Sequence, residues 1–424
     1  MGAFTIFTTK KHKSKPQRET ASSYYESCAR QVGYIKYIVL FMLVVFVVFG
    51  FTFFGSTLSM DNFRYMLKFM SVDVDSIIQD GSFIEFDTEQ NATALITNGN
   101  LAIVDTNGVQ IFDMTGERYL KDTEYYSDPI CVVNGSGLIV CDRKGYKLNI
   151  YSVYTKVYSD TFTYPVLDLC ASPSGNYAVL TAAKGYRSGI EVYDNNFRLI
   201  YYYYFADRYA SGIGLSADGG KAAICTLDNT SDGSFLGGMH IFNVTDASDI
   251  VFFEYHDEIP WKVWFRSNGS YLLLTNKAVR IYSNANELLS TIEFGDLSPK
   301  GYTFTDDYIA LSLSEASLSN ATTIKFYAAD GSYVGEISYH NNVSSMEIAN
   351  GYAYIYSVGT LYTVRISSME TVFHEDIGLT FITALYDKEE KRIIFLHKNK
   401  AVFYGNDTYI TTNKTEVTDN ERSS

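Results

Sequence analysis

The 424-residue sequence predicts an all-β protein, an eight-bladed β-propeller, preceded by one transmembrane α-helix. Three observations lead to this prediction. A short strand motif recurs about every 40 residues, each copy lies within a group of short strands, and a long apolar run precedes them all. Tyr (36) and Phe (28) are abundant while Pro (6) and Trp (2) are scarce, which also favours strands.

The apolar run covers residues 35–55, IKYIVLFMLVVFVVFGFTFFG. No charged residue lies between Lys36 and Asp61, and the run has about the 20 apolar residues that a membrane-spanning helix needs. Residues 1–36 carry a net charge of +5, so the remainder carries −19 of the total of −14. Positive charge marks the cytoplasmic end of a spanning helix. We therefore expect a single-pass anchor in the plasma membrane, with the N-terminus inside and the propeller outside; a cleaved signal peptide is the alternative.

The expected propeller is preceded and followed by shorter segments. In MDNFRYMLKFM, Met60, Phe63, Leu67 and Met70 recur at helical spacing, which indicates an amphipathic helix after the membrane. The predicted segments are a basic cytoplasmic tail (1–34), a transmembrane helix (35–55), an amphipathic juxtamembrane linker (56–80), the β-propeller (81–410) and a disordered C-terminal tail (411–424).

The recurring motif consists of an apolar residue, any residue, a second apolar residue and then Tyr or Phe. Counting blade starts near positions 92, 129, 165, 210, 260, 300, 341 and 378 yields eight blades, with seven as the alternative. The last blade has only three strands of its own, so we expect SFIEFDT (82–88) to complete it and close the ring. The motif occurs as VQIFD (109–113), LNIYS (148–152), IEVYD (190–194), MHIFN (239–243), VRIYS (279–283), IKFYA (324–328), more loosely YTVRI (362–366), and AVFYG (401–405).

Turn sequences support the same repeat. SPSG (172–175), SADGG (216–220) and RSNGS (266–270) each follow the first strand of a blade, and such turns suit residues that tolerate positive φ. These hairpins and the strand motif resemble the WD40-like and quinoprotein-like propeller superfamilies. The whole layout resembles a family of uncharacterised bacterial single-pass membrane proteins. The resemblance implies a fold and a topology, and it implies no activity.

Motifs for catalysis, cofactors or metals are not found in the sequence. Quinoprotein dehydrogenases use Trp residues between blades and adjacent cysteines, but this chain has only Trp261 and Trp264 and no adjacent cysteines. The six histidines have no metal-binding spacing. Asp228–Gly233 matches the start of a calcium loop, but Met239 replaces its final Glu, so a flexible acidic loop is the preferred interpretation. We expect no enzyme, no cofactor and no metal site.

Two questions about modification stay open at this stage. A hairpin centred on Ser136 would place Cys131 opposite Cys141, which allows a disulfide, although buried thiols in strands are common. Nine Asn-x-Ser/Thr sites fit either glycosylation or the preference of turns for these residues.

The predicted function is a non-catalytic module, outside the membrane, that binds a protein or a cell-envelope component. A small-ligand sensor or an enzyme with its site in the central channel is the alternative. The charge of −19 argues against nucleic acid. We expect one face of the ring to carry the loops that join consecutive blades and the long loops Leu227–Gly238 and Ser314–Thr322. Aromatic and Arg residues on such a face suit recognition of a protein partner. The candidate binding residues on that face are Tyr126, Asp128, Tyr164, Arg208, Tyr209, Trp261, Lys262, His340 and Asp376, with packing between blades as the alternative for Tyr164 and Trp261.

Overall fold

The computed structural model describes residues 36–45, 81–86, 88, 92–135, 137–230, 233–246, 250–315, 320–388, 390–405 and 409–410. The chain divides into two units, residues 1–71 and 72–424. In the first unit, residues 36–45 form a helix; among the described residues no helix is long and apolar enough to cross a membrane. Most of the predicted transmembrane segment lies outside the described residues, as do the 1–34 tail, the 56–80 linker and the 411–424 tail.

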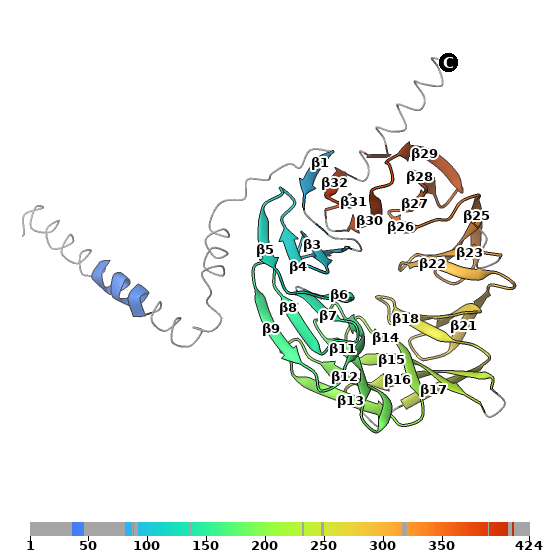
Figure 1. The fold of residues 1–424 in the computed structure, drawn as a ribbon, viewed down its shortest axis with the longest axis horizontal. Helices are drawn as coiled ribbons and strands as arrows, with labels where there is room; N and C mark the ends of the chain where they lie inside the picture. The colour runs from blue at the N-terminus through green and yellow to red at the C-terminus, as the bar shows by residue number, and fades with distance from the viewer. Residues whose placement is uncertain are drawn as a thin grey trace, which may run out of the picture. The chain divides into compact units, whose positions relative to one another are not determined.

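The second unit is a ring of eight antiparallel, four-stranded sheets, or blades (Figure 1). This confirms the eight-bladed prediction and excludes seven blades. Blades 1 to 7 each use four consecutive strands, the first nearest the centre of the ring and the fourth at its circumference. The strands are β1 (Ser82–Glu85), β2 (Thr93–Thr97), β3 (Asn100–Asp105), β4 (Gly108–Phe112), β5 (Arg118–Asp122), β6 (Pro129–Asn134), β7 (Gly137–Asp142), β8 (Lys147–Tyr151), β9 (Lys156–Thr161), β10 (Val166–Ala171), β11 (Tyr177–Ala183), β12 (Tyr186–Tyr193), β13 (Leu199–Phe205), β14 (Tyr209–Leu215), β15 (Lys221–Asn229), β16 (Phe235–Asn243), β17 (Ile250–His256), β18 (Pro260–Phe265), β19 (Tyr271–Thr275), β20 (Ala278–Tyr282), β21 (Leu288–Glu293), β22 (Ser298–Phe304), β23 (Tyr308–Ser314), β24 (Thr322–Ala328), β25 (Tyr333–Tyr339), β26 (Ser345–Ala349), β27 (Tyr352–Ser357), β28 (Thr360–Arg365), β29 (Glu370–Asp376), β30 (Phe381–Asp387), β31 (Arg392–His397) and β32 (Lys400–Gly405).

Blade 8 closes the ring with both ends of the propeller sequence. Its strand order is β1-β32-β31-β30, so the first strand of the propeller is the outer strand of the last blade. β1 pairs with β32 from Ser82 opposite Phe403 to Glu85 opposite Lys400. The expectation that residues 82–88 complete the last blade is confirmed for β1. Because the ring is closed, every blade has a neighbouring blade on each side.

The predicted strand motif forms the third strand of every blade. In blades 1 to 6 its aromatic residue is buried at the end of that strand and packs on the start of the second strand, whereas blade 7 has Arg365 at this position and Tyr404 of blade 8 is half-buried. Tyr193 stacks on Tyr177 with ring centroids 5.0 Å apart, and Tyr282 stacks on Tyr271 at 5.1 Å. Tyr193 and Tyr282 each lie in the cluster shared with the preceding blade, so the motif recurs because a large side chain at this place fills the space beside that blade. Eight apolar clusters, one between each pair of neighbouring blades, form the core.

The hairpin between the first and second strands has the expected backbone. Gly175, Gly219 and Gly269 have φ values of 97°, 71° and 82°. At Gly175 a Cβ would also lie 2.9 Å from Cβ of Asn195. The turn thus needs glycine both for its left-handed φ and for the close approach of the neighbouring turn.

The expected register of Cys131 and Cys141 is wrong. The turn contains two residues, and Cys131 lies opposite Val140 while Ile130 lies opposite Cys141. Shifting the register by one residue moves the two thiols to opposite faces of blade 2. Cys131 packs toward blade 1 and Cys141 toward blade 3, and both are free thiols.

The expected long loop at Leu227–Gly238 is also wrong in large part. β15 continues to Asn229 and β16 begins at Phe235, and Leu227 pairs with Gly237 across the hairpin. The polar sequence of this segment resembles a loop, but the two strands extend because each finds a hydrogen-bonding partner in the other.

Candidate binding surface

The connections between consecutive blades and the turns between second and third strands lie on one face of the ring, which we name the upper face. The remaining turns lie on the lower face. All nine sequence-predicted binding residues belong to the connections or adjacent strand ends of the upper face. These nine side chains differ in their exposure to solvent and in the residues that they contact.

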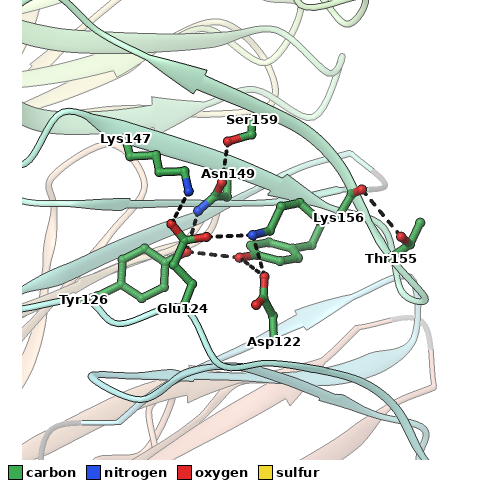
Figure 2. A network of polar contacts seen from close by, with 9 residues as sticks. Asp122, Glu124, Tyr126, Lys147, Asn149, Thr155, Lys156 and Ser159 are labelled. Carbon is green, nitrogen blue, oxygen red and sulfur yellow. Dashed lines mark hydrogen bonds and ion pairs between the residues drawn. The ribbon is translucent and has the colours of Figure 1, made fainter. Parts of the chain in front are cut away.

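Tyr126 is not part of an exposed surface, which corrects its assignment as a binding residue. Its side chain is 2% exposed and lies in the core between blades 1 and 2. Its hydroxyl lies 3.1 Å from that of Tyr151 and accepts a hydrogen bond of 2.9 Å from Nδ2 of Asn149 (Figure 2). Burial raises the pKa of Tyr126, in spite of these hydrogen bonds. The connection folds inward here because the ring of Tyr126 fills the space between the blades.

Charged residues cover this buried pair on the outside (Figure 2). Nζ of Lys156 lies 2.7 Å from Asp122 and 2.6 Å from Glu124, and Lys147 lies 2.6 Å from Glu124. Desolvation raises the pKa of each carboxyl, but hydrogen bonds from the lysines outweigh it and lower both pKa values overall. Asp122 and Glu124 come from blade 1 and its connection, and both lysines from blade 2. The network therefore joins two blades and is structural.

The Arg208 side chain packs against blade 4. Its Nη2 lies 3.3 Å from Oε2 of Glu254, and its Cζ lies 4.8 Å from the ring centroid of Phe252. A Cβ on Gly238 would lie 3.0 Å from Nη1 of Arg208 and 2.6 Å from Oγ1 of Thr226. Cε2 of Phe252 would lie 2.7 Å away, so a side chain at Gly238 would disturb Thr226 and Phe252 and crowd the guanidinium that packs on Phe252.

Tyr209 is the first residue of β14 and Trp261 the second residue of β18; these are neighbouring inner strands, and both side chains are exposed, at 55% and 41%. A Cβ on Gly212 would lie 2.2 Å from the backbone oxygen of Trp261, so the two strands approach closely through this glycine. The guanidinium Cζ of Arg187 lies 4.6 Å from the Tyr209 ring centroid. Both aromatic side chains are thus exposed yet carried by a rigid backbone.

Two further exposed aromatic residues accompany them, and they were missed by sequence reasoning. Tyr186 (49% exposed) starts β12 in blade 3, and Phe235 (46% exposed) starts β16 in blade 4. A single aromatic residue beside a polar turn, in KGYRSG and DGSFLGG, was the available signal. We name Tyr186, Tyr209, Phe235 and Trp261 the aromatic rim; it follows the upper face over blades 3 to 5.

The other predicted residues do not join the rim as exposed aromatics. Asp128 is exposed and its carboxylate lies 3.2 Å from Nε of Arg143. Tyr164 and Lys262 are half-buried, and Lys262 lines the central channel. His340 and Asp376 are exposed, but they follow and end the outer strands of blades 6 and 7, away from blades 3 to 5.

Two cavities accompany these surfaces. One of about 360 Å³ lies in the channel against inner strands of blades 2 to 5 and is lined by Cys170, Gly214, Lys262 and Trp264, among others. A larger one of about 770 Å³ opens on the lower face beside blades 6 and 7; Asp306, Asp307, Asp330 and Lys388 contribute to its lining.

Burial favours the neutral forms of four cysteine thiols and of His240. Burial raises the pKa of Cys131 to about 12 and raises those of Cys141, Cys170 and Cys225 further. Burial lowers the pKa of His240 to about 4. The described residues contain no group of three or more His, Cys, Asp or Glu side chains that could hold a metal ion. These thiols have little thiolate at neutral pH, so they are poor nucleophiles.

Closed topology and an exposed rim together define the class: an eight-bladed, WD40-like β-propeller with an aromatic surface on its upper face. The chain belongs to the family of unknown function DUF5711, whose model matches residues 71–404. This agrees with the expected resemblance in fold and family; its single-pass membrane part stays a prediction. A search of curated proteins finds no match.

Similar solved structures share the fold at low sequence identity, and the likeness therefore shows the fold alone. The Dos1 propeller aligns with a TM-score of 0.55 and 11% identity, covering 77% of this chain and 95% of that chain. The C-terminal WD40 domain of Sif2 aligns with a TM-score of 0.51 and 9% identity, covering 76% and 99%. BamB from Moraxella catarrhalis aligns with a TM-score of 0.49 and 12% identity, covering 77% and 97%.

Proposed function

We propose that this protein is a membrane-tethered propeller that acts outside the membrane as a non-catalytic binding module, and that it binds a protein partner through the aromatic rim. The observation that carries the proposal is the rim itself. Four aromatic side chains, each at least 41% exposed, lie on the upper face of three consecutive blades. Exposed aromatic residues that gather in one place are typical of protein interfaces, where Trp, Tyr and Arg dominate the binding energy.

The backbone beneath the rim supports this role. Gly212 holds β14 against β18, and the packing of Arg208 on Phe252 and Glu254 fixes the connection next to Tyr209. Aromatic side chains on rigid strands lose little conformational entropy on binding. A partner would therefore meet a surface that is already ordered.

The tether rests on the sequence of residues 1–61. The uncharged run at 35–55 and the basic residues before it favour a spanning helix with the propeller on the outer side. The net charge of −19 after residue 36 suits a domain that stands clear of an anionic bilayer. The raised pKa values of the four buried thiols and the lowered pKa of His240 support a binding role over catalysis by these groups.

Site-specific photo-crosslinking in native membranes tests the proposal. A benzoylphenylalanine would replace Trp261 or Tyr209 in the full chain, and Leu289 as control. Leu289 is 61% exposed and lies near the lower-face end of β21. We expect a discrete crosslinked protein band from the rim positions at least tenfold stronger than from Leu289. Equal labelling at all three positions would contradict a rim interface.

The channel cavity favours a second candidate, a sensor for a small anionic ligand. Lys262 lines this cavity together with Asp306, whose carboxylate accepts hydrogen bonds from Ser267, and in the described part of the chain no ion pair to the Lys262 ammonium is observed. Thermal unfolding of the full chain with a panel of small carboxylates tests it. A rise in the melting temperature that Lys262→Met abolishes would support the sensor; no rise with any carboxylate of the panel would count against it.

A further inference from the structure

The outer strand of blade 3 differs from the other seven outer strands. β13 has the sequence LIYYYYF and contains no charged residue. Charged side chains on an edge strand keep it from pairing with another chain. Each other outer strand has this protection: Arg118, Lys121 and Asp122 in β5, Lys156 and Asp160 in β9, Glu254 in β17, Glu293 in β21, Glu336 in β25, Glu370, Glu375 and Asp376 in β29, and Glu85 in β1.

The backbone of β13 is open on its outer side. Within the described residues it pairs with β12 alone, from Ser188 opposite Phe205 to Tyr193 opposite Leu199. A bulge, another device that protects edges, occurs only near the start of the strand, at Ile200. Tyr201–Phe205 therefore form a regular edge with unpaired hydrogen-bonding groups.

The side chains of β13 form two rows. Tyr201, Tyr203 and Phe205 pack on Phe242 of blade 4, with ring centroids 5.6, 5.0 and 6.2 Å apart. The alternate residues point the other way: Ile200 is 42% exposed and Tyr202 is 61% exposed, while Tyr204 is half-buried and its hydroxyl donates a hydrogen bond of 3.2 Å to Oε1 of Glu191 on β12. One row thus anchors the strand in the core, and the other offers an apolar strip along the same edge.

We propose that β13 pairs antiparallel with β13 of a second copy of this chain, about a two-fold axis at Tyr202. Two four-stranded blades then become one eight-stranded sheet. In this register Tyr202 faces its own copy, Tyr201 faces Tyr203 and Ile200 faces Tyr204. Every one of these cross-strand pairs is aromatic–aromatic or aromatic–β-branched, which are the favourable combinations.

The charge distribution and the symmetry both favour a second copy as the occupant. Two chains of net charge −14 repel each other, and β13 is the outer strand at which no like charges are brought together. A strand that is complementary to itself produces a closed two-fold interface, the commonest form of oligomer. Because a strand pair buries less surface than a standard interface, the dimer is reversible.

Cysteine crosslinking of the full chain tests this pairing in membranes. Tyr202→Cys is compared with Tyr333→Cys; Tyr333 is 57% exposed, close to the 61% of Tyr202, but lies on β25, an outer strand that carries Glu336. Copper-phenanthroline oxidises two facing thiols to a disulfide. We expect at least ten times more disulfide-linked dimer from Tyr202→Cys than from Tyr333→Cys. Equal yields from the two variants overturn the proposal.

Sedimentation of the detergent-solubilised full chain supplies a second measurement. The wild-type chain should show a concentration-dependent doubling of mass, and Tyr202→Lys should reduce the dimer fraction at least tenfold, while Tyr333→Lys leaves it unchanged. A wild-type chain that stays monomeric at all concentrations refutes the pairing. Crosslinking of Tyr202→Cys only to a different protein does so too, and assigns the edge to a foreign strand. Neither outcome bears on the rim, which uses other residues.

Discussion

The hydroxyls of Tyr126 and Tyr151 lie 3.1 Å apart between blades 1 and 2, and the two side chains are 2% and 1% exposed. Tyr126 comes from the connection that leaves blade 1, and Tyr151 is the motif residue of blade 2. Asp122 accepts a hydrogen bond of 2.9 Å from the Tyr151 hydroxyl. A buried hydroxyl is stable only with partners, so this contact ties the position of the connection to the neighbouring blade.

Removal of either hydroxyl should destabilise the propeller. Tyr126→Phe leaves Nδ2 of Asn149 without its acceptor, and we expect a loss of about 1–2 kcal/mol in the free energy of unfolding. Tyr151→Phe should cost a similar amount, and the double variant less than the sum because the two share one contact. Urea unfolding measures each value. Tyr125→Phe, at a side chain that is 72% exposed, is the control and should match the wild type.

Ring closure should depend on the inner face of β1. Ile84 is 4% exposed in the core between blades 8 and 1, whereas its neighbour Phe83 is 59% exposed. Ile84→Asn buries an amide without partners and should lower the free energy of unfolding by about 3 kcal/mol. Phe83→Asn on the same strand should have little effect. If both variants unfold at the same urea concentration as the wild type, β1 does not close the ring in solution.

The close approach of β14 and β18 should make Gly212 intolerant of a side chain. A Cβ there would lie 2.2 Å from the backbone oxygen of Trp261, so Gly212→Ala must push the strands apart. We expect a loss of about 2–3 kcal/mol in the free energy of unfolding and a shift in tryptophan fluorescence. At Gly301, in β22, a Cβ would meet only Cβ of Ser312 at 3.7 Å, an ordinary contact. Gly301→Ala should therefore leave stability and fluorescence nearly unchanged.

Glu347 should make stability fall as pH rises. Burial between blades 7 and 8 raises the pKa of Glu347 from 4.5 to about 7, and the charge of Lys388 opposes this only in part. The folded state therefore binds the proton more tightly than the unfolded state. This contribution is fully present below pH 4.5 and is lost as pH rises through 7, by roughly 3 kcal/mol at most.

Comparison with Glu347→Gln isolates that contribution from the other carboxyls. The variant cannot ionise, so the difference in unfolding free energy between it and the wild type should grow between pH 5 and 8 in favour of the variant. Urea unfolding at each pH measures it. A difference that stays constant over this range would show that Glu347 titrates normally.

Some features were predictable because they depend on local pattern. The third-strand motif located every blade, the glycine turns supported three of them, and SFIEFDT as the closing strand followed from counting strands in the last blade. The register of Cys131 was not predictable in the same way, because a two-residue and a three-residue turn at Gly135 differ by only one position. The burial of Tyr126 was missed because a connection between strands is normally exposed.

In the candidate binding surface, too, some residues were predictable from the sequence and others were not. Tyr209 and Trp261 were predicted because they stand near strand starts, which the repeat locates; both are exposed, and their binding role stays a prediction. Tyr186 and Phe235 were missed because their hairpins have ordinary turn sequences. The strands within Leu227–Gly238 were missed because a polar strand pair resembles a loop in sequence. Arg208 was expected on the surface, but Gly238 receives its guanidinium, a contact between residues 30 positions apart.

The amino-acid sequence by itself determined the repeat, the number of blades and the closing strand, since each follows from alternation and spacing along the chain. Tertiary structure alone decided which aromatic side chains are open to solvent and which fill the spaces between blades. Neighbouring blades meet through residues far apart in the sequence, and a difference of a single Cβ, as at Gly212, determines how closely they approach. Exposure is a property of that packing, so no local pattern contains it.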